Sequence, residues 1–416
     1  MEGLLELSYA LDTFYFLVMG ALVMWMAAGF TMLEAGLVRA KNTAEILTKN
    51  VGLYSIASIM YMICGYGIMY GDGTGVIPGI SMLTSADNAT ADVIAGGDDA
   101  PYYSSLSDFF FQVVFVATAM SIVSGAVAER MKLWSFFIFA VILTGFIYPI
   151  QGYWKWGGGW LDAAGFVDFA GSGVVHMCGG AAALAGVILL GARKGKYGPA
   201  GEVRAIPGAN LPLSAIGTLI LWLGWFGFNG GSELKIANVE EANAVSLVIV
   251  NTNMAAAGGL IAALLLARAW FGKADLTRAL NGALAGLVAI TAQPLTPSPL
   301  AATIIGGIGG LIVVPSIVMM DRMFKINDPV GAISVHGVVG MWGLIAVTFT
   351  DPESSIGAQL LGLFTILAWV FVTSFIVWLV IKMIMGIRVS EQEEYEGVDI
   401  GECGLEAYPE FSAPAE

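Results

Sequence analysis

Long apolar runs separated by short polar segments form the dominant pattern of this 416-residue chain. A helix needs about 20 apolar residues to cross a bilayer, and the sequence holds eleven runs of about that length. The predicted spans are residues 10–33, 50–71, 108–128, 133–153, 170–192, 212–231, 244–270, 278–293, 300–320, 331–350 and 358–386. Because the runs are continuous and not alternating, they predict an all-α polytopic membrane protein with 11 transmembrane helices and argue against an outer-membrane barrel.

Composition agrees with this prediction. Hydrophobic residues make up 57% of the chain and charged residues only 12%, which is too little charge for the surface of a soluble domain. The 54 glycines are typical of closely packed membrane helices, because small residues let helix backbones approach one another. The three cysteines do not suggest a disulfide framework.

The basic residues indicate an orientation. Eleven spans divide the connecting segments into two sets, and 16 of the 18 Lys and Arg residues fall in one set, with only Lys155 and Lys235 in the other. Basic residues favour the cytoplasmic side of a cell membrane. We therefore expect a multi-pass protein of the cell (inner or cytoplasmic) membrane, with the N-terminus outside and the C-terminus in the cytoplasm. The leader MEGLLELSY has no basic stretch, so no cleavable signal peptide is expected.

Acidic residues produce the formal net charge of −14 and gather in two places. One is the tail after Arg388, with nine acidic residues and no basic one. The other is the outer segment 72–108, which holds Asp72, Asp87, Asp92, Asp98, Asp99 and Asp108. Solubility explains both clusters as well as attraction of a cation or a partner does.

A short repeat places the only two histidines of the chain. Asp168 precedes His176 by eight residues, and Asp328 precedes His336 by the same distance. Each pair opens a span, the fifth in one case and the tenth in the other. The first five spans begin outside and the next five begin in the cytoplasm, so we predict two inverted five-helix halves plus an eleventh helix. Sites in such proteins form near the bilayer midplane between the halves.

Helical geometry then predicts how these residues meet. Eight residues rise about 12 Å along a helix, so each aspartate would cap a helix start and each histidine would lie well inside the membrane. Helices that start from opposite faces would bring the histidines together near the centre. Glycines that would permit this approach are Gly171, Gly173, Gly179, Gly180, Gly331, Gly337 and Gly340.

A buried histidine in a soluble core is usually structural, whereas an ionisable group inside a membrane more often lines a cavity or a proton relay. The balance therefore favours a functional pair. Cys178 lies beside His176, but two histidines and one thiol lack the usual ligand number of a metal site. We expect no bound metal and no cofactor.

Ordered motifs along nearly the whole chain resemble the ammonium transporter family (Amt/Mep/Rh), in particular its Amt branch. They are DFAGSGVVHMCGGAAALAGVILLGAR at 168–193, GLVRAKN at 36–42, GAVAERMK at 125–132, WGGGWL at 156–161, GWFGFNGGS at 224–232, NDP at 327–329, SVHG at 334–337 and the tail GIRVSEQEEYEGVDIGECGLEAYPE at 386–410. One departure is Cys403, which stands where many relatives have a histidine and puts the details of tail regulation in doubt.

The resemblance implies roles for individual residues. An outer ammonium recruitment site is expected at Phe111, Trp156 and Ser232, and a hydrophobic gate below it at Phe115 and Phe228. The pore histidines are His176 and His336, with Asp168 and Asp328 in structural and electrostatic roles. Leu221 and Trp225 are expected to line the lumen. Without the resemblance, the aromatic residues would be interpreted as packing or as interfacial anchors.

The resemblance also implies a homotrimer in the lipid bilayer, with a pore through each subunit. Residues 1–386 would form the membrane domain, with inverted repeats at about 10–192 and 212–350 and the extra helix at 358–386. The acidic tail 387–416 would pack under a neighbouring subunit, and a P-II-type regulatory protein is a candidate partner at that face. No nucleic acid partner is expected.

The predicted activity is ammonium transport. Ammonium would lose its proton at the outer mouth, and neutral ammonia would pass the histidines, with the proton following separately. An alternative is an ammonium sensor on the same scaffold without net transport. A conductor of another neutral molecule is disfavoured by the cation site at Trp156 and Ser232. We expect no enzyme, because no nucleophile and base stand at a workable spacing.

Overall fold

The computed structural model describes residues 2–97 and 100–411, and within these ranges the protein is helical. Asp98, Asp99 and the last five residues of the acidic tail lie outside the described residues. The α-helices are α1 (Glu2–Leu37), α2 (Thr43–Met60), α3 (Tyr66–Tyr70), α4 (Thr90–Ala95), α5 (Ser105–Ala126), α6 (Leu133–Ile142), α7 (Tyr148–Lys155), α8 (Trp160–Ala163), α9 (Cys178–Leu190), α10 (Leu211–Gly231), α11 (Val239–Phe271), α12 (Leu276–Ile290), α13 (Pro299–Arg322), α14 (Val339–Ala346), α15 (Ile356–Ile384) and α16 (Glu391–Glu396).

Several spans contain a wider, π-helical turn. These turns are Tyr61–Gly65, Leu143–Ile147, Ser172–Met177 and Ile333–Val338, and a fifth, Asp399–Cys403, lies in the tail. Short 3₁₀ turns are Ala40–Asn42, Val347–Phe349 and Pro409–Phe411. Turns of the π type inside α-helices often mark functional sites, and here two of them carry the histidines.

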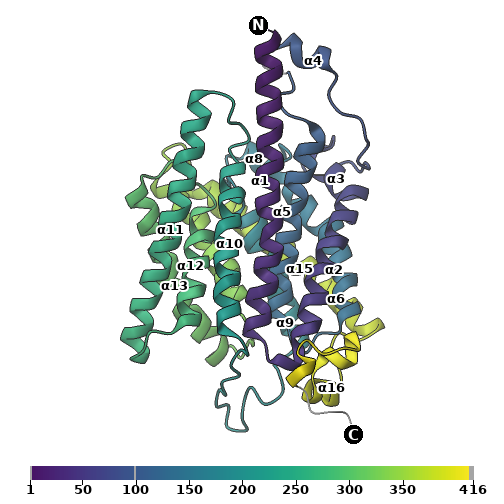
Figure 1. The fold of residues 1–416 in the computed structure, drawn as a ribbon, viewed down its shortest axis with the longest axis vertical. Helices are drawn as coiled ribbons and strands as arrows, with labels where there is room; N and C mark the ends of the chain where they lie inside the picture. Colours follow the sequence, from purple (N-terminus) through teal and green to yellow (C-terminus); the bar gives the residue numbers. More distant parts are fainter. Residues whose placement is uncertain (1, 98–99, 412–416) are drawn as a thin grey trace.

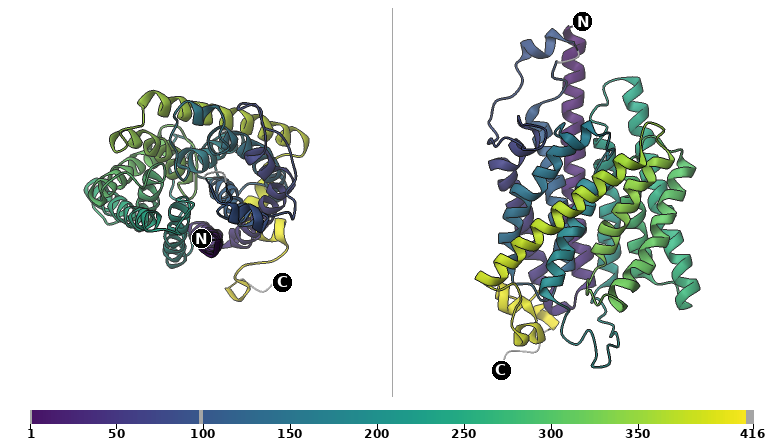
Figure 2. Two further views of the ribbon diagram at one scale, coloured as in Figure 1. Left: turned by 90° about the horizontal axis from the view of Figure 1, so that it is seen from above. Right: turned by 180° about the vertical axis from the view of Figure 1, so that it is seen from behind.

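The helices form one bundle with the chain ends at opposite ends of it. In Figure 1 the start of α1 rises above the bundle, whereas the tail with α16 lies below it. Figure 2 shows α15 crossing the back of the bundle obliquely. Nine helical segments among the described residues are long and apolar enough to cross a membrane, and Leu276–Ile290 and Ile333–Phe349 are shorter apolar helices. Each predicted span overlaps one of these segments, and most ends agree within a few residues. The structure extends the first segment back to Glu2, begins the second at Ala40 and ends the fourth at Ala163.

Small residues bring the helices into backbone contact. A Cβ atom added to Gly310 of α13 would lie 2.1 Å from the carbonyl oxygen of Gly259 in α11. No side chain larger than hydrogen fits at that distance. The glycine-rich composition is therefore used for close packing in this bundle, as expected where lipid supplies no hydrophobic driving force.

Buried charges tie the loops together at the end of the bundle where the tail lies. Glu129 follows α5, is 1% exposed, and contacts Arg39 at 2.7 Å and Arg193 at 3.0 Å. Burial alone would raise the pKa of the Glu129 carboxyl, but the two guanidinium groups outweigh burial, and the pKa lies below its usual value. The ionised Glu129 carboxylate therefore links three connecting segments through its ion pairs.

The acidic tail docks against its own chain through specific contacts. Asp399 accepts a hydrogen bond from the backbone N–H of Glu45 at 2.9 Å, and Glu402 accepts one from that of Leu133 at 2.8 Å. Glu394 pairs with Arg388 at 2.6 Å. Several acidic groups of the tail are thus structural, and solubility is not their only role.

Candidate functional site

The two histidines of the chain meet inside the bundle. The Nδ1 atoms of His176 and His336 are 3.2 Å apart, a hydrogen-bond distance, and the rings are 5.2 Å apart between centroids and inclined by 27°. Both side chains are buried, with exposed fractions of 0% and 3%. Since one ring must donate and the other accept, the contact fixes one tautomer of each neutral ring.

The same local structure presents both histidines. Each lies in a π-helical turn, and each turn is preceded by a glycine in the left-handed region, Gly171 with φ 107° and Gly331 with φ 83°. Each glycine follows its aspartate by three residues. A left-handed φ is readily adopted only by glycine, so the repeat extends from the D-x7-H spacing to the backbone conformation.

The aspartates cap these turns. Asp168 accepts hydrogen bonds from the backbone N–H groups of Gly173 and Val174 at 3.0 and 2.8 Å. Asp328 accepts from those of Val330, Gly331 and Ile333 at 2.7–3.1 Å. Both carboxylates thus lie at helix starts, which is the geometry expected from their positions in the sequence.

A glycine contact sets how closely the two histidine helices approach. A Cβ atom on Gly180 would lie 2.4 Å from the backbone nitrogen of Gly337, the residue that follows His336. The helices therefore touch through backbone beside the histidine pair. Any larger residue at position 180 would push the two segments apart.

Aromatic rings surround His176. Its ring stacks on Trp225 with 4.8 Å between centroids and on Phe228 with 5.3 Å. The indole N–H of Trp225 donates to the hydroxyl of Thr291 at 2.8 Å, which fixes the ring. Among the described residues, the buried Nε2 atom of His176 has no hydrogen-bond partner. The pair thus keeps one hydrogen-bonding position that the described residues do not use.

A cavity of about 390 Å³ is lined by all three predicted recruitment residues, Phe111, Trp156 and Ser232, together with Phe115. We call it the outer cavity because it lies at the end of the bundle that is expected to face outward. The indole N–H of Trp156 donates to the backbone carbonyl of Asp168 at 2.8 Å. This bond connects the cavity to the turn that carries His176. Aromatic faces attract cations, and a serine hydroxyl accepts an N–H bond.

Two phenylalanines separate this cavity from the histidines. The rings of Phe115 and Phe228 stack with 4.0 Å between centroids and 26° between planes. Phe115 lines the outer cavity and Phe228 stacks on His176. A stacked apolar pair at this point leaves no polar group to replace the hydration shell of an ion.

Asp108 is a further residue of the outer cavity that the resemblance did not assign. Its carboxylate is 7% exposed and accepts hydrogen bonds from Tyr66 at 2.6 Å and Gln112 at 3.1 Å. Sequence reasoning treated it as one acidic residue of the outer segment. Its position one turn before Phe111 on the same helix could have identified it.

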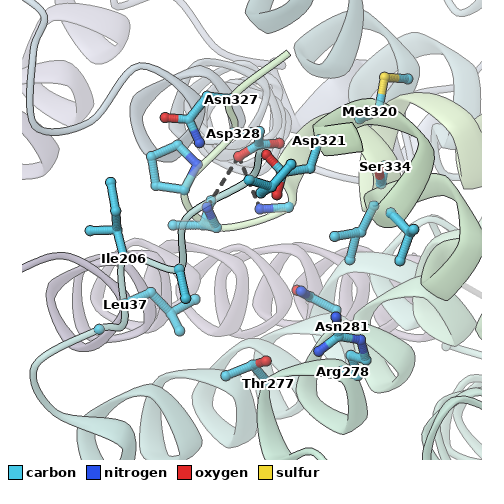
Figure 3. Close-up of a pocket in the computed structure, with 18 of the residues that line it drawn as sticks. Leu37, Ile206, Thr277, Arg278, Asn281, Met320, Asp321, Asn327, Asp328 and Ser334 are labelled. Carbon is cyan, nitrogen blue, oxygen red and sulfur yellow. Dashed lines mark hydrogen bonds between the residues drawn. The ribbon is translucent and has the colours of Figure 1, made fainter. Parts of the chain in front are cut away.

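A larger cavity of about 540 Å³ lies at the opposite end of the bundle. Figure 3 shows Asn281, Arg278, Asp328 and Ser334 around it, with Asp328 bonded to its own helix start. Its charges are largely paired, as in the contact between Arg278 and Asp275. The histidine pair thus lies between two polar cavities.

Three further apolar residues near the site pack against neighbouring helices. Leu221 is fully buried and packs against Gly29 of α1. Phe109 stacks on Tyr61, and Phe110 packs against Gly20; both therefore face neighbouring helices and not the outer cavity. Within residues 2–97 and 100–411, no group of three or more His, Cys, Asp and Glu side chains has the arrangement of a metal site.

Comparisons with known proteins identify the family. The family model of the Ammonium Transporter Family matches residues 14–408. The chain belongs to this family. Ammonium transporter Amt2 of Archaeoglobus fulgidus is 41% identical, with 96% of this chain and 88% of the relative aligned. The family consists of transporters and not of enzymes.

Two solved structures have the same fold. A structure described as a sensor Amt protein is 35% identical and superposes with a TM-score of 0.88, covering 96% of this chain and 99% of its own. Mep2 of Candida albicans is 27% identical with a TM-score of 0.82, covering 99% and 93%. Both support a membrane bundle of the ammonium transporter type.

Proposed function

We propose that this protein transports ammonium by separating it into ammonia and a proton. Ammonium would bind in the outer cavity between Phe111 and Trp156, with an N–H group bonded to Ser232. It would lose its proton there, and ammonia would pass Phe115 and Phe228 to reach the histidines. The proton would follow separately along the imidazole pair, so net transport would carry charge.

The physical reason is the cost of burying an ion. Moving a cation into an apolar lumen costs several kcal/mol or more even after relaxation, whereas neutral ammonia avoids most of that cost. The observation that carries the proposal is the 3.2 Å contact between His176 and His336 between two polar cavities. A paired imidazole contact offers a proton route where water is scarce.

The proposal includes the assembly and orientation implied by the family resemblance. The one-sided distribution of basic residues supports an N-terminus outside and a C-terminus in the cytoplasm, and the cavity of about 390 Å³ would then face outward. The subunits form a homotrimer in the cell membrane. The docked tail and the neighbouring loops form the cytoplasmic face, where a P-II-type regulator would bind.

Sensing without net transport is the second candidate, because a solved structure similar to this chain is described as a sensor Amt protein. The same outer cavity would serve either function. The two candidates differ in one respect: a transporter passes substrate continuously, whereas a sensor responds to binding alone.

Current measurement on a solid-supported membrane distinguishes them. Liposomes containing the purified protein receive a step in ammonium concentration, and protein-free liposomes receive the same step as the control. Transport predicts a sustained current that scales with the amount of protein. A brief binding signal that decays without sustained current would contradict the proposal and favour a sensor.

A further inference from the structure

Glu34 is a carboxylate buried in the part of α1 nearest its C-terminal end. Its exposed fraction is 1%. It accepts hydrogen bonds from the side-chain amide of Asn50 in α2 at 3.1 Å and from the hydroxyl of Ser124 in α5 at 2.5 Å. A carboxylate buried to this degree is costly and is usually paired with a cation.

The buried cation of the neighbouring helix is engaged elsewhere. Lys49 pairs with Glu45 one turn away at 3.3 Å and also lies over the ring of Phe136. Glu34 is thus left with two neutral donors, Asn50 and Ser124. Within residues 2–97 and 100–411, no ion pair holds the Glu34 carboxylate in its ionised form.

Ser124 can satisfy Glu34 in either protonation state. When Glu34 is ionised, the hydroxyl donates to it at 2.5 Å. When Glu34 is protonated, its O–H can donate to the same hydroxyl oxygen, and the serine hydroxyl can turn to the backbone carbonyl of Ser121 at 2.8 Å. Both states therefore keep a complete set of hydrogen bonds at this contact.

Glu34 shares a cavity with the histidine pair. A small cavity of about 10 Å³, the space of about one water molecule, is lined by Glu34, His336, Ser121 and Asn281 among others. Asn281 and Val330 also line the large inner cavity, in which Figure 3 shows Asn281. The small cavity lined by Glu34 and His336 therefore adjoins the inner cavity.

We propose that Glu34 is the proton acceptor on the inner side of the histidine pair. This inference rests on the proposed function. The His336 imidazolium gives its proton to the Glu34 carboxylate, directly or through one water, and the neutral imidazole is restored. The carboxylic acid then gives the proton to ammonia or water in the inner cavity, which regenerates the carboxylate and yields ammonium or hydronium.

Two substitutions at position 34 test the proposal, because a proton-acceptor role and a purely structural role predict opposite orders of current for them. Glu34→Gln keeps the length of the side chain. Its amide oxygen can accept from Asn50 and its amide N–H can donate to the Ser124 hydroxyl, but the amide cannot accept and release a proton. Glu34→Asp keeps a titratable carboxyl group but shortens its reach. A proton acceptor predicts more current in E34D than in E34Q, whereas a purely structural tie between α1, α2 and α5 predicts the reverse.

Asp12→Asn is the matched control. Asp12 lies on the same helix, is 4% exposed, and accepts hydrogen bonds from the backbone N–H groups of Ile236 and Ala237. D12N removes a buried carboxylate without touching the cavity of Glu34. We expect D12N to keep the wild-type current and E34Q to lose it by about 100-fold, the scale of a lost proton-transfer group.

Sustained ammonium current on a solid-supported membrane is measured for all four proteins, after size-exclusion chromatography has shown matching assembly. Wild-type current that persists in E34Q, or that falls equally in E34Q, E34D and D12N, overturns the role of Glu34 while the proposed function stands. No sustained current in the wild type contradicts both. Should E34Q fail to assemble, E34D alone decides: current supports the proposal, and its absence overturns it.

Discussion

His176 and His336, 160 positions apart in the chain, face each other with their Nδ1 atoms 3.2 Å apart. Each ring is positioned by its own π-helical turn, and an aspartate caps each turn. The contact therefore forms only when both segments are correctly placed. Two copies of one local structure thus build a single site at the place where they meet. Changes to either copy should therefore affect the pair as a whole.

Gly180→Ala should disrupt this meeting without removing a functional side chain. The added Cβ would lie 2.4 Å from the backbone nitrogen of Gly337, so the two histidine helices must separate. We expect loss of ammonium current and a destabilisation of about 1–3 kcal/mol, measured by thermal unfolding in detergent. The control is Gly307→Ala, where the nearest atom is 3.8 Å away. Full current in G180A would show that the spacing is not critical.

Asp108→Asn should weaken ammonium binding in the outer cavity. A unit charge about 4 Å from a cation contributes about 1–4 kcal/mol, depending on the local dielectric. We therefore expect the half-saturating ammonium concentration to rise by at least about tenfold, with the maximal current unchanged. The exposed Asp92 of α4 gives the matched control D92N. An equal change in both variants would indicate a general effect of surface charge.

Phe228→Ala should reduce ion selectivity. The stacked pair with Phe115 has 4.0 Å between ring centroids, and removing one ring opens a path that water can fill. We expect potassium current to appear beside ammonium current on a solid-supported membrane. Phe364→Ala, on the exposed face of α15, controls for the loss of a phenyl ring. An unchanged ratio of the two currents in F228A would count against a hydrophobic gate.

Glu129→Gln should destabilise the protein in a pH-dependent manner. The pKa of Glu129 is lowered below 4.5, so its ion pairs stabilise the fold above that pH and are lost as the pH falls through the lowered value. We expect the wild type to be more stable than E129Q by about 3 kcal/mol at neutral pH. Thermal unfolding at a series of pH values should show this difference shrinking in acid. A difference that stays constant in acid would contradict the role of these ion pairs.

Much of the fold could be predicted from the sequence because a helix that crosses a bilayer must be apolar along its length. Apolar runs gave all eleven helical segments, and the equal spacing of Asp168–His176 and Asp328–His336 pointed to the pair. The outer residues Phe111, Trp156 and Ser232 came only from the family resemblance, since isolated aromatic residues carry no signal of their own.

The rest depends on tertiary contacts that no local pattern encodes. Asp108 looked like one acid of a polar loop, and only the fold places it in the outer cavity. Glu34 lies just past the first predicted span and was not identified there, and only the packing of α2 and α5 shows that it shares a cavity with His336 and forms no ion pair among the described residues. The π-helical turns were not predicted either, because the sequence analysis assumed a regular α-helical rise between each aspartate and its histidine.

The most direct test of the central claim is the selectivity of the current with each histidine removed. Ammonium and potassium steps are applied to liposomes on a solid-supported membrane for the wild type, His176→Ala and His336→Ala. The account predicts ammonium current and no potassium current in the wild type, and in each variant either no current or current with both ions. Full ammonium current with unchanged selectivity in either variant would contradict it.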